Sequence, residues 1–236
     1  MESFCDKFKH LGVDMEDDLF SFMDSLRLPY PSGILQIGAS YGQEIKSFVE
    51  KKVENCIFIE PLLEPFTYIS NICRNTPGFI AVNCLCSDYE NQIVDFFVAN
   101  NMGQSSSMLA PKKHLDVFDY VKFDSTIKLK TTTVDHVIKL LEENGHATIV
   151  NNIDTLYMDV QGAEYKVLLG SLKTLKQIKF IYFELIRGDL YENIFDLKIY
   201  MSFLESQGFL LNNINFNSEH HANALFVRAE ILGISN

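Results

Sequence analysis

The stretch Leu156-Tyr157-Met158-Asp159-Val160-Gln161-Gly162-Ala163-Glu164 decides how the fold of this chain is interpreted. Three apolar residues lead to Asp159, and a helix can begin within the Gly-Ala-Glu sequence that follows. An apolar run that ends on one polar side chain is typical of a buried parallel strand. In open α/β sheets, ligands bind at the carboxyl edge of such strands. Asp159 is therefore predicted either to face a ligand or to cap the helix that begins near Ala163.

Short apolar runs alternate with helical segments along most of the chain. We expect strands at 34–37, 56–59, 79–82, 154–159 and 179–184, with helices at 42–52, 61–74, 134–144, 165–175 and 194–207. Further strands are predicted at 93–98 and 126–133, on either side of a long Ser-rich connection, and at 209–216 and 224–228. This pattern predicts an α/β fold with a single doubly wound, mostly parallel sheet and an antiparallel C-terminal hairpin. We expect a helical extension over 1–30 and one domain over 31–236.

Composition and charge exclude several classes of protein. The 236 residues carry a net charge of −11 and no dense Lys/Arg stripe, which argues against a nucleic-acid partner. No apolar stretch is long enough to span a membrane. The five cysteines have no CxxC spacing, and the charged N-terminal segment does not resemble a signal peptide. We therefore expect free thiols and a cytoplasmic location, while the sequence leaves the oligomeric state open.

A glycine turn follows the strand expected at 34–37. It runs from Gly38 to Gly42 with the spacing G-x-x-x-G, which differs from the G-x-G-x-x-G of dinucleotide-binding proteins. Glycines at this point allow a tight turn and a close approach of the backbone to a ligand. Any strand-to-helix turn can use glycines in this way, so the turn alone leaves a purely structural role open.

Glu60 and Pro61 end the strand expected at 56–59. Glu60 lies 22 residues beyond Gly38, which is where an acidic residue can accept hydrogen bonds from both ribose hydroxyls. Alternatively, Glu60 interacts favourably with the N-terminus of the helix that Pro61 begins. No phosphate-binding glycine loop is present in the sequence. The combination favours a nucleoside ligand without a phosphate chain.

Asp159 and Glu184 end two successive predicted strands. Two neighbouring carboxylates at one sheet edge can act as a general base and a supporting acid, or bind a divalent cation. The structural alternative is that Asp159 caps a helix and Glu164 interacts with its first turn. Ser106 and Ser107 lie in the long polar connection, where a flexible loop over a ligand is the expected role.

Together these segments resemble the FkbM-type family of S-adenosylmethionine-dependent methyltransferases. The resemblance extends from about Ile34 to Val227. It depends on several blocks in order, namely ILQIGASYGQE, IFIEP, NCLCSD, the QSSS loop, TTTVDHV, LYMDVQGAEYKVLLG, IYFEL and the terminal GFLL…ALFV segments. The family usually has an acidic residue in place of Gln36 and Asn in place of Ser40.

The resemblance implies a class I, Rossmann-like methyltransferase fold with S-adenosylmethionine as cofactor. The glycine turn would contact the methionine part of the cofactor, Glu60 the ribose, the segment from Cys84 to Ser87 the adenine, and Asp159 would lie near the transferred methyl group. The cofactor-binding residues expected on this basis are Gly38, Ala39, Ser40, Gly42, Glu60, Pro61, Cys84, Ser87 and Asp159.

Members of this family commonly methylate hydroxyl oxygens of sugars or of glycosylated and polyketide products. The resemblance therefore implies an O-methyltransferase acting on a sugar hydroxyl of a glycan or glycoconjugate. Asp159 is expected to be the base or to orient it, and a divalent cation between Asp159 and Glu184 is the alternative. The expected catalytic residues are Asp159, Glu184 and Gln161, and the expected substrate-binding residues are Ser106, Ser107 and Glu164. A non-sugar small-molecule acceptor and a non-catalytic nucleoside-binding module are alternatives, whereas the glycine spacing disfavours an NAD-linked oxidoreductase.

Overall fold

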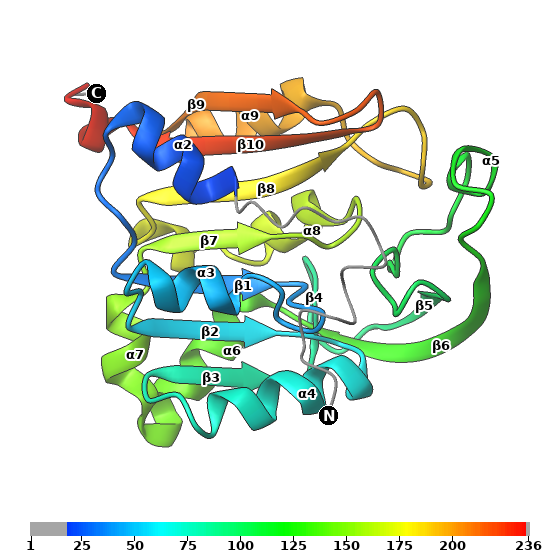
Figure 1. The fold of residues 1–236 in the computed structure, drawn as a ribbon, viewed down its shortest axis with the longest axis horizontal. Helices are drawn as coiled ribbons and strands as arrows, with labels where there is room; N and C mark the ends of the chain where they lie inside the picture. Colours follow the sequence, from blue (N-terminus) through cyan, green and yellow to red (C-terminus); the bar gives the residue numbers. More distant parts are fainter. Residues whose placement is uncertain (1–17, 235–236) are drawn as a thin grey trace.

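The computed structural model describes residues 18–234. Within them, the main sheet has seven strands in the order β3-β2-β1-β7-β8-β10-β9 (Figure 1). The strands are β1 (Gly33–Ile37), β2 (Asn55–Ile59), β3 (Phe79–Val82), β7 (Thr155–Met158), β8 (Phe180–Ile186), β9 (Phe209–Phe216) and β10 (His221–Arg228). β1, β2, β3, β7 and β8 pair in parallel, whereas β10 pairs antiparallel with both β8 and β9. The predicted mostly parallel sheet with an antiparallel C-terminal hairpin is confirmed.

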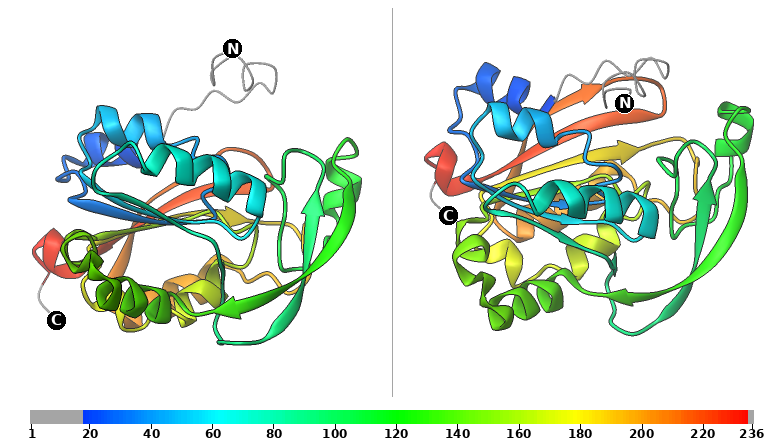
Figure 2. Two further views of the ribbon diagram at one scale, coloured as in Figure 1. Left: turned by 90° about the horizontal axis from the view of Figure 1, so that it is seen from below. Right: turned by 60° about the horizontal axis from the view of Figure 1, so that its bottom comes forward.

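Helices cover both faces of this sheet (Figure 2). One face carries α2 (Asp18–Leu26), α3 (Ile45–Glu50) and α4 (Leu63–Cys73), and the other carries α6 (Val134–Leu141), α7 (Ala147–Asn152), α8 (Glu164–Leu169) and α9 (Leu197–Ser206). Alternate residues of each strand point to opposite faces, so that Ile34 packs in one apolar core and Leu35 in the other. Among residues 18–234, no helix is long and apolar enough to cross a membrane.

Several predicted boundaries differ from the structure. Residues 1–17 of the helical extension expected over 1–30 lie outside the described residues, and α2 packs Leu19, Phe20 and Met23 into the core beside α3. The expected domain boundary near residue 30 stays a prediction. The helix expected at 134–144 ends as α6 at Leu141, and a π-helical turn (Glu142–His146) and α7 continue the chain. Gly145 in this turn has φ +88°, which an α-helix excludes.

A second sheet, which the sequence did not predict, stands at the carboxyl edge of the main sheet (Figure 1). It contains β4 (Leu85–Cys86), β6 (Phe123–Thr132) and β5 (Ile93–Ala99), in that order. The strands expected at 93–98 and 126–133 are both present, and they pair with each other outside the main sheet. The long connection between them carries the short helix α5 (His114–Val117). The small sheet and this connection therefore face the end of the main sheet where ligands bind in such folds.

Backbone hydrogen bonds hold the ends of the central strands together at this edge. The amide of Gly38 donates to Ile59 at 2.9 Å, and the amide of Asp159 donates to Ile37 at 3.0 Å. The turn after β1 is thus fixed between the ends of β2 and β7. Gly38 has φ +80°, and a Cβ atom there would collide with the carbonyl oxygen of Asp159.

The close approach at Gly38 gives the first testable prediction. Gly38→Ala combines a strained φ with a backbone collision, so we expect it to lower the free energy of unfolding by about 3–5 kcal/mol. Gly145→Ala is the matched control, because Gly145 has φ +88° but no atom within 4 Å of an added Cβ. This control should cost only about 1–2 kcal/mol. Urea denaturation of both variants provides the comparison, and equal losses would contradict the close approach.

Candidate active site

A cavity of about 980 Å³ lies at the carboxyl edge, between the main sheet and the small sheet. This volume is at the upper end of the roughly 300–1,000 Å³ usual for small-molecule sites. Loops from distant parts of the sequence line it, including the glycine turn, the end of β2, β4, the connection before β6, the end of β7 and the terminal hairpin. Of the residues predicted for the site, the cavity wall includes Gly38, Ser40, Glu60, Pro61, Cys84, Ser106, Asp159, Gln161 and Glu184.

The other predicted site residues lie behind this wall. Ala39 is fully buried in the core, and the amide of Gly42 donates to Ala39 O at 2.7 Å. The hydroxyl of Ser87 donates to Asp88 at 2.8 Å, which keeps Ser87 beside β4. The Ser107 hydroxyl donates to the carbonyl oxygen of Gln161 at 2.8 Å. These residues support the cavity without lining it.

Glu60 lies at the end of β2 and is 5% exposed. Its two carboxylate oxygens accept the backbone amides of Ser40 and Leu62, each at 2.8 Å. The glycine turn thus delivers a main-chain donor to this side chain. A carboxylate oxygen can accept more than one hydrogen bond, so each oxygen keeps acceptor capacity for a further donor. This capacity suits a ligand with two neighbouring hydroxyl donors.

The helix-capping alternative for Asp159 is wrong. α8 begins at Glu164, and its N-cap residue, Ala163, makes no side-chain cap bond. The backbone amides of Val160 and Gly162 in this turn donate to Glu164 Oε1, at 3.0 Å and 3.2 Å. Asp159 lies one residue beyond β7 and faces the cavity.

Gln161 joins the two predicted catalytic carboxylates. Its side-chain nitrogen donates to Asp159 Oδ1 at 2.7 Å and to Glu184 Oε2 at 3.1 Å. The Tyr191 hydroxyl lies 3.1 Å from Gln161 Oε1 and 2.8 Å from the carbonyl oxygen of Ser105, with one proton to share between them. The strand was expected to end at Glu184, but β8 continues to Ile186, so that Glu184 lies inside the strand.

The amide of Gln161 occupies the position between Asp159 and Glu184 that a bridging cation would need. Among residues 18–234, no group of three His, Cys, Asp or Glu side chains is arranged to hold a metal ion. With the amide hydrogen-bonded to both carboxylates, the arrangement suits proton transfer and orientation of a substrate better than metal binding. The divalent-cation alternative has no support in this geometry.

Burial raises the pKa of five carboxyl groups at this end of the sheet. The pKa of Asp159 rises to about 7 because of burial and the nearby charge of Glu184, and that of Glu184 rises to about 7 because of burial and the charge of Glu164. Burial raises the pKa of Glu60 and Glu44 to about 7 and that of Glu164 to about 8. None of the ion pairs found in the described part of the chain includes any of these groups. The cavity is therefore electrostatically suited to a cation.

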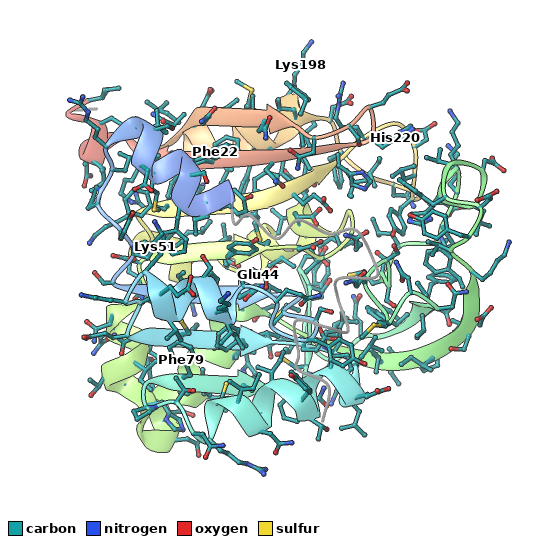
Figure 3. The ribbon with its side chains drawn as sticks, viewed as in Figure 1. Phe22, Glu44, Lys51, Phe79, Lys198 and His220 are labelled. Carbon is teal, nitrogen blue, oxygen red and sulfur yellow. The ribbon has the colours of Figure 1, made fainter. Side chains whose placement is uncertain are left out.

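Some residues of the site were not predicted from the sequence. Glu44 lines the cavity just before α3 (Figure 3) and accepts a hydrogen bond from the side chain of Gln36 at 2.8 Å. A carboxylate at the start of a helix after a glycine turn was a detectable signal for Glu44. Tyr191 lies in a loop without periodicity, and no sequence signal connects it to Gln161. Asn223 and Tyr182 also line the cavity. They lie on the paired strands β10 and β8.

The glycine turn, the buried carboxylate that follows β2 and the strand order are typical of a class I S-adenosylmethionine-dependent methyltransferase. The model of the methyltransferase FkbM domain matches residues 36–211, and the chain belongs to this family. It is 31% identical over 183 residues to the 2-O-methyltransferase NoeI of Sinorhizobium fredii, with 73% of this chain and 71% of that protein covered. The predicted family, enzyme class and cofactor are confirmed.

Two solved structures are similar to this chain at much lower sequence identity. The magnesium protoporphyrin IX methyltransferase of Synechocystis, solved with bound S-adenosylmethionine, has a TM-score of 0.51 and 9% identity, with 97% of this chain and 85% of that chain covered. A methyltransferase of Aquifex aeolicus has a TM-score of 0.47 and 13% identity, with 96% and 100% covered. The similarity to the Synechocystis enzyme supports the fold assignment.

The residues around the cavity fit the cofactor. S-adenosylmethionine carries a positive sulfonium and a positive ammonium group, and the cavity wall offers Glu44, Glu60 and Asp159 without basic partners. Gly38, which has no side chain, lets the glycine turn pack against the backbone of Asp159 at the cavity wall. The chemistry of the wall therefore matches a cationic nucleoside.

The raised pKa values predict how stability depends on pH. A carboxyl group whose pKa is higher in the folded state binds more protons there than in the unfolded chain, so stability falls as pH rises towards the folded pKa. The melting temperature of the ligand-free protein should therefore fall from about pH 5 to about pH 8 and level off above that. Each unit of pKa elevation corresponds to about 1.4 kcal/mol once the group is ionised.

Differential scanning calorimetry with and without S-adenosylmethionine checks this expectation. A cation beside the carboxylates offsets their repulsion, so the melting temperature should fall less with rising pH when the cofactor is saturating. A ligand-free melting temperature that stays constant or rises across this window would contradict the electrostatic description of the cavity.

Proposed function

We propose that this enzyme transfers a methyl group from S-adenosylmethionine to a hydroxyl oxygen of a sugar in a glycan or glycoconjugate. The proposal is carried by the wall of the cavity that lies away from the glycine turn. There the turn after β7, β8, the terminal hairpin and the connection before β6 contribute amide, hydroxyl, imidazole and aromatic groups to the wall that also includes Asp159 and Glu184. These residues are Ser105, Ser106, Phe118, Tyr120, Gln161, Tyr182, Asn217, His221 and Asn223.

The charge of this wall favours an uncharged acceptor. Burial and the neighbouring histidines lower the pKa of His221 to about 4, so its imidazole is neutral at physiological pH. Of the described residues that line the cavity, Lys46 is the only lysine or arginine, and its ammonium group lies 3.8 Å from Glu50 on the rim. Carboxylates and phosphates would meet Asp159 and Glu184 without a compensating cation. Neutral sugar hydroxyls can both donate to carboxylates and accept from amide groups.

The similarity to a 2-O-methyltransferase supports transfer of the methyl group to an oxygen atom. NoeI, at 31% identity, is named a 2-O-methyltransferase. A hydroxyl oxygen as acceptor agrees with the site, because a hydroxyl must lose its proton during methyl transfer and two carboxyl groups lie ready to accept one. The cavity volume of about 980 Å³ accommodates a cofactor and part of an acceptor side by side.

Asp159 is the proposed general base. With a pKa of about 7, a large fraction of the group is ionised at neutral pH and can still accept a proton effectively. Gln161 orients the carboxylate through its 2.7 Å hydrogen bond, and Glu184 shares the same amide donor. When bound, the cofactor would supply a methyl group on a sulfonium centre to the acceptor oxygen. Glu60 binds the ribose, Cys84 lies beside the adenine, and Ser106 contacts the acceptor.

The same proposal covers the location and partners of the protein. The cysteines within the described residues, Cys56, Cys73, Cys84 and Cys86, are free, which agrees with a reducing compartment such as the cytoplasm. The net charge of −11 agrees with a partner other than nucleic acid. A non-sugar acceptor and a non-catalytic nucleoside-binding module are the alternatives that the following experiments separate.

An acceptor panel tests the proposed function. The protein is incubated with S-adenosylmethionine carrying a labelled methyl group, and with neutral glycans, glycans containing uronic acids, sugar phosphates and non-sugar alcohols. We expect mass spectrometry to show one added methyl group on a neutral sugar, with anionic sugars methylated at least about tenfold more slowly. Methylation of the non-sugar alcohols alone would overturn the sugar assignment, and cofactor binding without any transfer across the panel would favour the non-catalytic alternative.

Asp159→Asn tests the proposed base. The amide keeps the shape and hydrogen-bonding capacity of the side chain but cannot accept the proton, so kcat should fall by about 10²–10⁴-fold. Asp124→Asn, an exposed substitution on β6, removes the same charge and should leave kcat unchanged. Turnover of Asp159→Asn near the wild-type rate, with the cofactor still bound, would show that Asp159 is not the base.

A further inference from the structure

The pair formed by Gln36 and Glu44 has no role in the reaction described above. Gln36 lies in β1 and is 1% exposed, whereas Glu44 lines the cavity and Gln36 does not. The side-chain nitrogen of Gln36 donates to Glu44 Oε2 at 2.8 Å. The side-chain oxygen of Gln36 is buried and has no hydrogen-bond partner in the described part of the chain. A buried amide that leaves its acceptor unsatisfied indicates that its orientation is fixed by the carboxylate it faces.

The strand order places Glu44 relative to the other carboxylates. Glu60 follows β2, Glu44 follows the turn after β1, and Asp159 follows β7, and these strands are neighbours in the order β2-β1-β7. A nucleoside whose ribose is bound at Glu60 therefore extends across the end of β1. Its other end reaches the space between Glu44 and Asp159. This placement depends on the proposed function of the cavity.

The charges of these three groups act on one another through the cavity. The negative charge of Asp159 raises the pKa of both Glu44 and Glu60 in addition to the effect of burial. Lys46, two residues beyond Glu44, lies 3.8 Å from Glu50. Glu44 thus offers a carboxylate to the cavity, and its hydrogen-bond partner in the structure is the neutral amide of Gln36.

We propose that Glu44, positioned by Gln36, binds the ammonium group at the amino-acid end of S-adenosylmethionine. The carboxylate can accept from the ammonium group while one of its oxygens keeps the bond to Gln36. An amide at position 36 holds Glu44 without adding charge, whereas a second carboxylate at this distance would repel it. Glu44 is a cofactor-binding residue in this proposal, and Gln36 is a positioning residue.

Three ligands separate the ammonium contact from the rest of the cofactor. S-adenosylmethionine has the ammonium and the sulfonium, S-adenosylhomocysteine has the ammonium alone, and 5′-methylthioadenosine has neither. Their dissociation constants are measured by isothermal titration calorimetry for the wild type, Glu44→Gln, Gln36→Leu and the control Glu54→Gln. Glu54 is exposed on the loop before β2, so the control removes the same charge away from the cavity.

Glu44→Gln should weaken the binding of both ammonium-containing ligands by about 10- to 100-fold, the usual effect of losing a hydrogen bond to a charged group. Binding of 5′-methylthioadenosine should change less than about twofold, which also shows that the variant is folded. Gln36→Leu should weaken the two ammonium-containing ligands by a smaller factor and shift the pH midpoint of their binding upwards, because Glu44 loses the donor that favours its ionised form. The control should leave all three constants unchanged.

Two results would overturn the assignment of Glu44. One is unchanged binding of S-adenosylmethionine and S-adenosylhomocysteine by Glu44→Gln, and the other is an equal loss for all three ligands. Either result leaves the proposed function intact, because the wild type still binds the cofactor. Failure of the wild type to bind S-adenosylmethionine would instead overturn the proposed function together with this inference.

Discussion

The repulsion among buried carboxyl groups at the carboxyl edge of the sheet is the constraint on which the site depends. Five of these groups have pKa values raised by burial, and none takes part in the ion pairs found within residues 18–234. Burying an unpaired carboxylate is unfavourable, so a cation that enters the cavity relieves a cost already present in the fold. The groups are Glu44, Glu60, Asp159, Glu164 and Glu184.

Neutral amides keep these carboxyl groups apart and in place. Gln36 donates to Glu44, and Gln161 donates to Asp159 and Glu184. Backbone amides do the same for Glu60 and Glu164. Amide donors favour the ionised form without neutralising it, so the charge stays available to a ligand. The glycine turn makes this possible, because its positive φ angles direct a main-chain amide towards Glu60.

The sequence predicted the main features of the fold because they depend on local patterns. Apolar runs located the parallel strands, and the glycine turn, Glu60 and Asp159 followed from their positions at strand ends. The pairing of β5 with β6 in a separate sheet was missed, since alternation identifies a strand but not its partner. Tyr191 contacts Gln161 from a loop 30 residues away, a tertiary contact that no spacing rule encodes. Glu164 satisfies backbone amides within its own turn, which is the local role that the structural alternative gave it.

The release of protons on cofactor binding is the most direct test of whether buried, unpaired carboxyl groups favour a cation in the cavity. Calorimetric titration of the wild type with S-adenosylmethionine at pH 7, in buffers with different heats of ionisation, gives the number of protons exchanged. A cationic ligand lowers the pKa values of carboxyl groups that are partly protonated near pH 7. The account therefore predicts net proton release, and a smaller release for S-adenosylhomocysteine, which lacks the sulfonium charge. Binding with no proton release, or with proton uptake, would contradict it.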